Sequence, residues 1–274
     1  MSGSPQTDEG SRNRMKWKLR LLLFACMIVL LTMIIEAAAI HQGDRSPEEK
    51  NTDSAAAAET DANSRESMKR ANAKLLYMGQ ASIRITTAEG KVIYIDPYAG
   101  DGYEPAADLI LVTHGHYDHN GVDRVVNRNQ DCQVITWREA LKGGKHQIFD
   151  LGYATVEAVE AGYNRWHDIR HCVGYIVTLS DGVSIYVTGD TSRTKQMEQL
   201  AERNIDYAFY CCDGVFNMGL EEAAECAELV GAKHNIPYHV LAQDGVYFDR
   251  ERAEQFTAPN CLIVDEGVEI ELVK

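Results

Sequence analysis

The sequence predicts an α/β fold in which two packed β-sheets are flanked by helices. Short apolar runs rich in Val, Ile and Tyr are first separated by tight turns and then alternate with helical segments, and this order occurs twice between residues 73 and 274. Hydrophobic residues make up 45% of the 274 residues, enough to fill a sizeable core. We therefore expect one globular domain at 73–274, preceded by two segments of different character.

Residues 1–40 have the pattern of a signal peptide or a signal-anchor helix. Five cations between residues 12 and 20 precede the apolar run 21–35, and three alanines at 37–39 offer a cleavage site. Such a charge order places the following chain outside the cytoplasm, so we expect an exported protein, secreted or anchored to the membrane by an uncleaved N-terminal helix. Residues 41–72 are rich in Ser, Ala, Glu and Asp, which predicts a disordered linker.

The first half of the domain begins with hairpin signals. Gly79-Gln80 and Ala88-Glu89-Gly90 mark turns between apolar runs, and Asp96-Pro97 ends the third run. The predicted strands are 74–78, 81–87, 91–95, 109–113 and 133–136. We expect helices at 122–127 and at 137–142, the second ended by Gly143-Gly144.

The second half repeats this rhythm. Asp181-Gly182 is a strong hairpin signal, and the small residues of 220–230 recur with the period of one helix face. The predicted strands are 154–161, 173–179, 183–188, 207–211, 235–240, 261–264 and 268–272. The predicted helices are 194–203, 220–230 and 250–256.

Charge and cysteine content limit the function classes. The formal net charge of −14 argues against a nucleic-acid-binding face, which needs clustered Lys and Arg. Seven cysteines are present without a CxxC pair, so a structural zinc knuckle is not supported. Their spacings form no disulfide framework, and most are expected to be buried small apolar residues.

Residues 113–119, Thr-His-Gly-His-Tyr-Asp-His, form the most informative stretch. Three imidazoles and one carboxylate follow the apolar run 109–112 directly. Neutral imidazole and carboxylate are ligands of zinc, iron and manganese, and a loop at the end of a buried strand is a rigid place to hold them. Asp96, Asp190 and His239 each follow another β run, and His167 and His171 lie between two strands. All of them are expected at one edge of the sheets.

The motif His114-x-His116-x-Asp118-His119 resembles the HxHxDH signature of the metallo-β-lactamase superfamily. Gly189-Asp190-Thr191 resembles its GDT element. The segments 218–223 and 236–239 are similar to the branch that contains ascorbate-6-phosphate lactonase and the phospholipase D-type phosphodiesterases, although Tyr238 replaces the usual Met. The resemblance covers the chain from about residue 73 onward and implies a four-layer αβ/βα metallo-β-lactamase sandwich.

The resemblance also implies a ligand set for two divalent ions, most readily zinc, with manganese or iron as alternatives. One ion would be held by His114, His116 and a third histidine, which we assign to His167 with His171 as the competitor. The second ion would be held by Asp118, His119 and His239. Asp190 would bridge the two ions, and Asp96 would orient the histidine loop.

The implied activity is hydrolysis of an ester-type bond, such as a phosphodiester or a lactone, in a small-molecule substrate by a metal-bound hydroxide. Asp118 would act as the catalytic proton acceptor. The same motif also occurs in diiron oxidoreductases, and a non-catalytic, metal-stabilised surface binding protein is the other alternative. Five residues are candidates for the pocket wall or for ordinary packing: Arg165, Trp166, Arg193, Tyr210 and Phe216.

Overall fold

The computed structural model describes residues 72–241 and 245–274. The predicted signal segment 1–40 and almost all of the predicted linker lie outside the described residues. All of the described residues belong to one compact unit, Ser64–Lys274. In that described part, none of the helices has the length and apolar character needed to span a membrane.

The first sheet has six strands in the order β14-β1-β2-β3-β4-β5. Strands β1 to β3 pair antiparallel as two hairpins, whereas β3, β4 and β5 run parallel to one another. Strand β4 is buried along its whole length. The strands are β1 (Lys74–Gly79), β2 (Ser82–Thr86), β3 (Val92–Ile95), β4 (Ala107–Val112), β5 (Arg128–Thr136) and β14 (Val268–Glu271).

The second sheet also has six strands, in the order β13-β12-β11-β10-β9-β8. Its antiparallel half contains β8 to β11, and β11, β12 and β13 run parallel. A small two-stranded hairpin, β6 (Leu141–Lys142) with β7 (Lys145–His146), lies apart from both sheets in the pairing pattern. The strands are β8 (Ile148–Asp150), β9 (Ala154–Glu160), β10 (Val173–Leu179), β11 (Ser184–Val187), β12 (Tyr207–Cys211) and β13 (His234–Tyr238).

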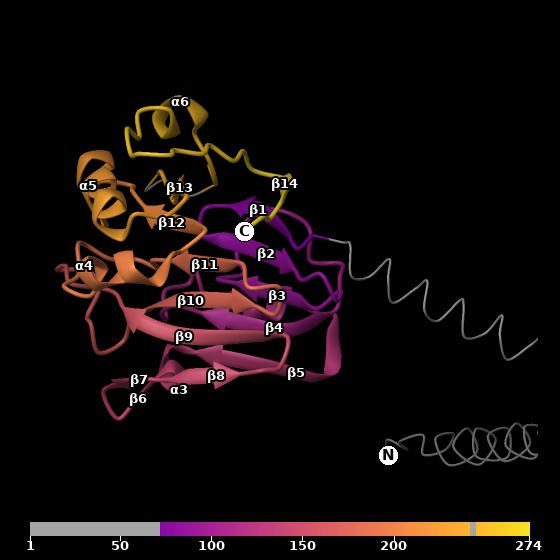
Figure 1. Ribbon diagram of the computed structural model, residues 1–274. Coiled ribbons are helices and arrows are strands. Elements are labelled where there is room, and N and C mark those ends of the chain that lie inside the picture. Colours follow the sequence, from indigo (N-terminus) through magenta and orange to yellow (C-terminus); the bar gives the residue numbers. More distant parts are fainter. Residues whose placement is uncertain (1–71, 242–244) are drawn as a thin grey trace, which may run out of the picture. The chain divides into compact units, whose positions relative to one another are not determined.

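One hydrophobic core fills the space between the two sheets, which lie one behind the other in Figure 1. Burying a branched aliphatic side chain contributes about 1.5–3 kcal/mol, so this core supplies most of the stabilisation. A polar contact also joins the sheets: the Tyr175 hydroxyl from β10 donates to the carbonyl oxygen of Val112 at the end of β4, 3.0 Å away. This bond lies one residue before the histidine cluster and therefore fixes where that loop begins.

Few helices accompany the sheets. Helix α5 (Leu220–Val230) buries its small residues, including Ala223, Ala227 and Val230, and contacts β12 and β13. The remaining helical segments of the described residues are α4 (Met197–Leu200), α6 (Arg250–Ala253), α3 (Trp137–Ala140), and the 3-10 turns η2 (Val122–Arg124) and η3 (Ala201–Arg203). The predicted α/β sandwich is thus confirmed, with α4, α5 and α6 on the side of the second sheet in Figure 1.

Several local predictions were wrong. The helices expected at 194–203 and 250–256 are shorter, since the first is α4 followed by the 3-10 turn η3 and the second ends at Ala253. The segment 122–127 is only a 3-10 turn, because the polar residues after it form β5, an edge strand that starts at Arg128 rather than at Gln133. The helix expected at 137–142 ends at Ala140, and the next two residues start a hairpin instead. The run 261–264 is not a strand; Cys261 makes a single bridge to Asn235.

The described cysteines, Cys132, Cys172, Cys211, Cys212, Cys226 and Cys261, are all free thiols, and four of them are buried. This agrees with their predicted role as small apolar residues.

Candidate metal centre

The candidate site lies where the carboxyl ends of parallel strands from both sheets meet. Strands β3 and β4 deliver Asp96 and the loop 113–119 from the first sheet. Strands β11 and β13 end just before Asp190 and His239 in the second sheet. The carboxyl ends of parallel strands are a common location for functional side chains, and here two sheets contribute at once.

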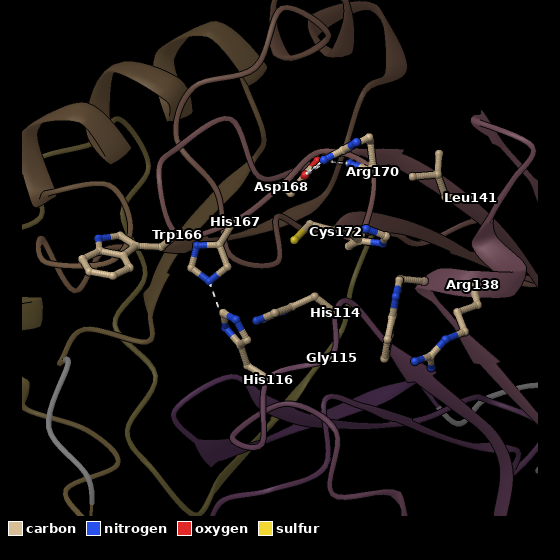
Figure 2. A pocket seen from close by; sticks show the side chains of 12 residues that line it. His114, Gly115, His116, Arg138, Leu141, Trp166, His167, Asp168, Arg170 and Cys172 are labelled. Carbon is tan, nitrogen blue, oxygen red and sulfur yellow. Dashed lines mark hydrogen bonds and ion pairs between the residues drawn. The ribbon is translucent and has the colours of Figure 1, made fainter.

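His114, His116 and His167 form the first group of potential ligands. Each offers a ring nitrogen, and the three nitrogens lie within 4.8 Å of one another. His116 Nδ1 is 3.2 Å from His167 Nε2. Figure 2 shows the three rings turned toward one another at one side of a cavity. The spacing of the two loop histidines therefore places both in reach of His167, which comes from a segment about fifty residues later in the chain.

The rings of His114 and His167 are oriented by neighbouring oxygens. The Thr113 hydroxyl lies 3.1 Å from His114 Nδ1, which leaves Nε2 of this ring for the site. The side-chain oxygen of Asn164 lies 3.2 Å from His167 Nδ1 and also accepts from the His167 backbone N–H. Partners on the outer nitrogen select the tautomer that presents a lone pair inward.

Asp118, His119 and His239 form the second group, again with ligand atoms within 4.8 Å of one another. Asp190 lies between the two groups. One of its oxygens is 3.4 Å from His119 Nε2, and the other is 3.3 Å from His167 Nε2 and 3.8 Å from His239 Nε2. The structure thus brings the predicted residues together as two triads with Asp190 between them, and His114, His119 and Asp190 form a further group that overlaps both triads.

Asp96 orients the loop as the sequence predicted. Its Oδ1 accepts from the Thr113 backbone N–H (2.7 Å), and its Oδ2 accepts from the Thr113 hydroxyl (2.6 Å) and from His119 Nδ1 (2.8 Å). The side chains of Asp96 and His119 are completely buried. Because a carboxylate only accepts, Nδ1 of His119 carries a proton, and Nε2 is the ring nitrogen that faces the site and could bind a metal.

Two amide side chains at the site were missed by the sequence reasoning. Gln80, in the turn between β1 and β2, donates from Nε2 to Asp118 Oδ2 (2.8 Å). Asn217 donates from Nδ2 to Asp190 Oδ2 (2.8 Å) and to Asp213 Oδ2 (2.7 Å). Gln80 and Asn217 belong to neither triad, and each donates a hydrogen bond to a carboxylate of the site. In the sequence, these two residues were distinguished only by their position in turns after predicted strands. Asn and Gln are common at such positions in proteins without a functional site.

Backbone strain collects around the site. Six non-glycine residues of the described part have positive φ, and two of them are asparagines. Asn, Asp and His adopt this conformation more readily than other non-glycine residues. The other four are Gln80 (51°), Asp96 (46°), Tyr163 (61°) and His239 (48°). Such conformations cost about 1–3 kcal/mol each and persist only where surrounding contacts impose them. Their concentration here indicates that side-chain placement, not stability, determines this part of the fold.

The electrostatics separate the histidines into two kinds. Burial, together with the neighbouring charge of His119, lowers the pKa of His114 well below its usual value, and burial also lowers the pKa of His167. Burial alone would lower the pKa of His119, but the charges of Asp190 and Asp96 raise it well above the usual value. His114 and His167 are therefore neutral at pH 7, as a metal ligand must be.

Both carboxylates that face the triads are ionised. Burial alone would raise the pKa of Asp118, but its interaction with His239 and the charge of His119 lower it to about 2. For Asp190, the effect of burial is likewise overcome by the charges of His119 and His239, which hold its pKa well below the usual range. The centre therefore combines imidazoles with two negative charges, a donor set that suits zinc, iron or manganese.

The hydrogen bonding of the buried atoms supports a bound cation. His114 Nε2, His119 Nε2 and Asp190 Oδ1 are buried and have no hydrogen-bond partner. Leaving a buried polar atom unpaired costs about 1–3 kcal/mol, and these atoms all face the same point between the triads. A metal ion would satisfy all of them, so the residues present fit such a group.

A cavity of about 670 Å³ opens beside the first triad. His171, the alternative third histidine, lies in its wall and belongs to none of the ligand groups. Of the five candidate pocket residues, Trp166 lines this cavity and Phe216 packs against Trp166 edge-on. Tyr210 is fully buried and Arg193 forms an ion pair with Glu198, and neither residue lines this cavity.

The model of the family described as beta-lactamase superfamily domain matches residues 74–239. The chain belongs to this superfamily. A curated relative from Pyrococcus furiosus, named a UPF0173 metal-dependent hydrolase, is 32% identical over 216 residues, which cover 70% of this chain and 95% of the relative. A second, from Geobacillus thermodenitrificans, bears the same name and is 31% identical over 206 residues, covering 64% and 91%.

A solved structure agrees on the superfamily fold. The metallo hydrolase from Ignicoccus hospitalis superposes with a TM-score of 0.57 at 20% identity, covering 74% of this chain and all of the other. Every ligand candidate from His114 to His239 falls inside the range of the superfamily match.

Proposed function

We propose that this chain is a metal-dependent hydrolase that cleaves an ester-type bond in a small molecule at a dinuclear centre. The observation that carries the proposal is the pair of ligand triads with the ionised Asp190 between them and with unpartnered buried atoms facing inward. The curated relatives in the same superfamily are named metal-dependent hydrolases, which supports the same reaction class.

The proposed ligands of one ion are His114, His116 and His167, and those of the other are Asp118, His119 and His239. Asp190 would contribute to both. The donor set of imidazoles and carboxylates favours zinc, and also accepts manganese or iron. Bound divalent ions would supply Lewis acidity toward the bond under attack and lower the pKa of water toward ~7.

The protein's own part is positioning and proton transfer. Asp118 is the proposed proton acceptor, because it is ionised, belongs to the second triad and keeps 18% of its side chain exposed. Gln80 holds Oδ2 of this carboxylate in place. Asp96 and Asn217 fix His119 and Asp190 in the same way, so the centre is oriented before a substrate arrives.

The test is an assay of the zinc-loaded full chain against a panel of phosphodiesters, lactones and aryl esters, with bound metal quantified. We expect metal-dependent hydrolysis of at least one class. In Asp118→Ala, the rate should fall by about 10²–10⁴-fold, the usual contribution of a positioned acid or base. Asp123→Asn, a change at an exposed carboxylate five residues along the same loop segment, is the matched control and should keep the activity.

Two results would contradict this function. A wild-type protein that binds metal but cleaves nothing, with an Asp118→Ala variant that keeps metal and fold, would favour a binding protein. Oxidation of a substrate by an iron-loaded protein, without hydrolysis by the zinc form, would favour the oxidoreductase alternative.

We also propose that the domain acts outside the cytoplasm, on the support of the basic and apolar pattern of residues 1–40. Cell fractionation of the full chain, with antibody detection of the domain and a cytoplasmic marker enzyme, tests this. Recovery of the domain only with the cytoplasmic marker would contradict it.

A further inference from the structure

The cavity beside the first triad has a mixed wall of aromatic and basic side chains. Trp137, Leu141 and Trp166 provide apolar surface, and the polar part includes Arg138, Arg170, His171 and Asp168. A volume of about 670 Å³ is typical of a site for a small organic ligand. Because three of the proposed metal ligands lie in the same wall, whatever fills the cavity lies next to the centre.

Of the two arginines in this wall, Arg170 is paired with a carboxylate and Arg138 is not. Arg170 is held by Asp168, with its Nη2 2.5 Å and its Nε 3.0 Å from that carboxylate, and Figure 2 shows its guanidinium turned toward Asp168. These two charges compensate each other. Among the described residues, no carboxylate forms an ion pair with Arg138, although the chain as a whole carries a net charge of −14. The cavity is thus a locally positive place in an acidic protein.

Arg138 is also held in place. Its guanidinium lies over the Trp137 ring, 4.1 Å from the ring centre. The neighbouring carboxylate, Glu139, is engaged in a capping box with the backbone N–H and the hydroxyl of Thr136. An arginine that stacks on an aromatic ring keeps the edge of its guanidinium for paired hydrogen bonds to a carboxylate or a phosphate.

The same tryptophan joins Arg138 to the histidine loop. A Cβ atom on Gly115 would lie 2.9 Å from two carbons of the Trp137 ring, so the loop backbone touches the ring directly. Glycine at this position permits that approach. Packing therefore fixes the Trp137 ring beside the first triad, and the exposed Arg138 side chain lies over that ring.

We propose that Arg138 binds an anionic group of the substrate, a carboxylate or a phosphate, while the bond to be cleaved lies at the histidine cluster. The apolar remainder of the substrate packs on Trp137 and Trp166. This inference rests on the proposed hydrolytic function and narrows its substrate class to esters that carry a negative charge close to the scissile bond.

The first test measures binding without chemistry. Benzylphosphonate, phenylacetate and the neutral benzyl alcohol are titrated by calorimetry into the metal-free full chain, so that no ion contributes. We expect both anions to bind at least about 10-fold more tightly than the alcohol. Arg138→Gln should weaken both anions about 10–100-fold, as expected for a lost charge-assisted hydrogen bond, and leave the alcohol unchanged. A larger loss for one anion identifies whether phosphate or carboxylate is preferred.

Two further variants sharpen this test. Arg138→Lys keeps the charge but loses the paired geometry, so an intermediate loss is expected. Arg165→Gln is the matched control, because Arg165 stacks on Trp166 in the same manner, 4.6 Å from the ring centre, without lining the cavity. It should bind all three probes as the wild type does. Equal anion binding by wild type and Arg138→Gln would overturn the proposal.

The second test separates this inference from the proposed function. The zinc-loaded wild type is assayed with monophenyl succinate, an anion, and with methyl phenyl succinate, its neutral counterpart. We expect the anion to have the higher kcat/KM, with the preference lost in Arg138→Gln. If neither ester nor any other panel substrate is cleaved while anion binding still needs Arg138, the hydrolytic function fails and the anion site stands. If both esters are cleaved equally by wild type and variant, the anion site fails.

Discussion

The substitution Asp96→Asn tests how the second triad is prepared for metal. An amide has about the same shape as the carboxylate, but one of its two polar atoms donates instead of accepting. If the amide oxygen takes the Oδ2 position, the NH₂ group faces the Thr113 backbone N–H at 2.7 Å, which places two donors in contact. If the amide is reversed, the NH₂ group faces the Thr113 hydroxyl and His119 Nδ1 instead.

The reversed orientation is the better one, because a hydroxyl and an imidazole nitrogen can both accept. It forces His119 to carry its proton on Nε2, which then points into the site where the ligand lone pair should be. Changes at such supporting residues typically cost 10–100-fold in metal affinity, or about 1.4–2.7 kcal/mol. We expect that loss for the ion at Asp118, His119 and His239, with the other ion nearly unaffected.

The assay is a calorimetric titration of zinc into metal-free protein, with thermal unfolding followed in parallel. Asp108→Asn is the control, because Asp108 is also buried and accepts from the Val92 backbone N–H (2.9 Å) and from Lys91 (2.9 Å), away from the ligand groups. The control should lose stability without losing metal affinity. Unchanged affinity for both ions in Asp96→Asn would refute the proposed role of the His119 tautomer.

Three further outcomes follow from the same geometry. Asn217→Ala removes the donor on Asp190 Oδ2 and should weaken metal binding about 10-fold in the same titration, and an unaltered isotherm would contradict this. Because the pKa of His119 is raised in the metal-free protein, zinc must displace a proton from this ring, and the affinity for zinc should therefore fall as the pH falls. Zinc titrations in two buffers of different ionisation enthalpy should show proton release at pH 7. Gly115→Ala places a methyl group 2.9 Å from the Trp137 ring. We therefore expect weaker metal binding and a free energy of unfolding, measured by denaturant titration, that is lower by about 1–3 kcal/mol. A variant with wild-type values would show that the ring moves freely.

The sequence was sufficient for the parts of the fold in which pattern and burial agree. Strands such as 173–179 and 207–211 and the helix 220–230 were predicted at their observed bounds, because their apolar residues are buried in the core. For β5, only the last four residues, 133–136, were predicted, and the first five, most of which are exposed, were missed. An edge strand with polar side chains has no alternating pattern to reveal it, and only pairing with β4 makes it a strand.

The site shows a similar division. The histidines and carboxylates were predictable because their residue types already specify ligand chemistry, and the ligand assignments stay a prediction until metal is located. Gln80 and Asn217 were not predictable, because an amide gains its role only from what lies opposite it after folding. Arg138 is a comparable case, since the cavity that it lines is formed by the loop after β4, by α3 and β6, and by the loop before β10.

The most direct test of the central claim is a crystal structure of the zinc-loaded protein with an anomalous-scattering map at the zinc edge. We predict two peaks, one bounded by His114, His116 and His167 and the other by Asp118, His119 and His239, with the Asp190 carboxylate between them. A single peak would contradict the proposed dinuclear centre, and a peak ligated by His171 in place of His167 would contradict the proposed ligand set.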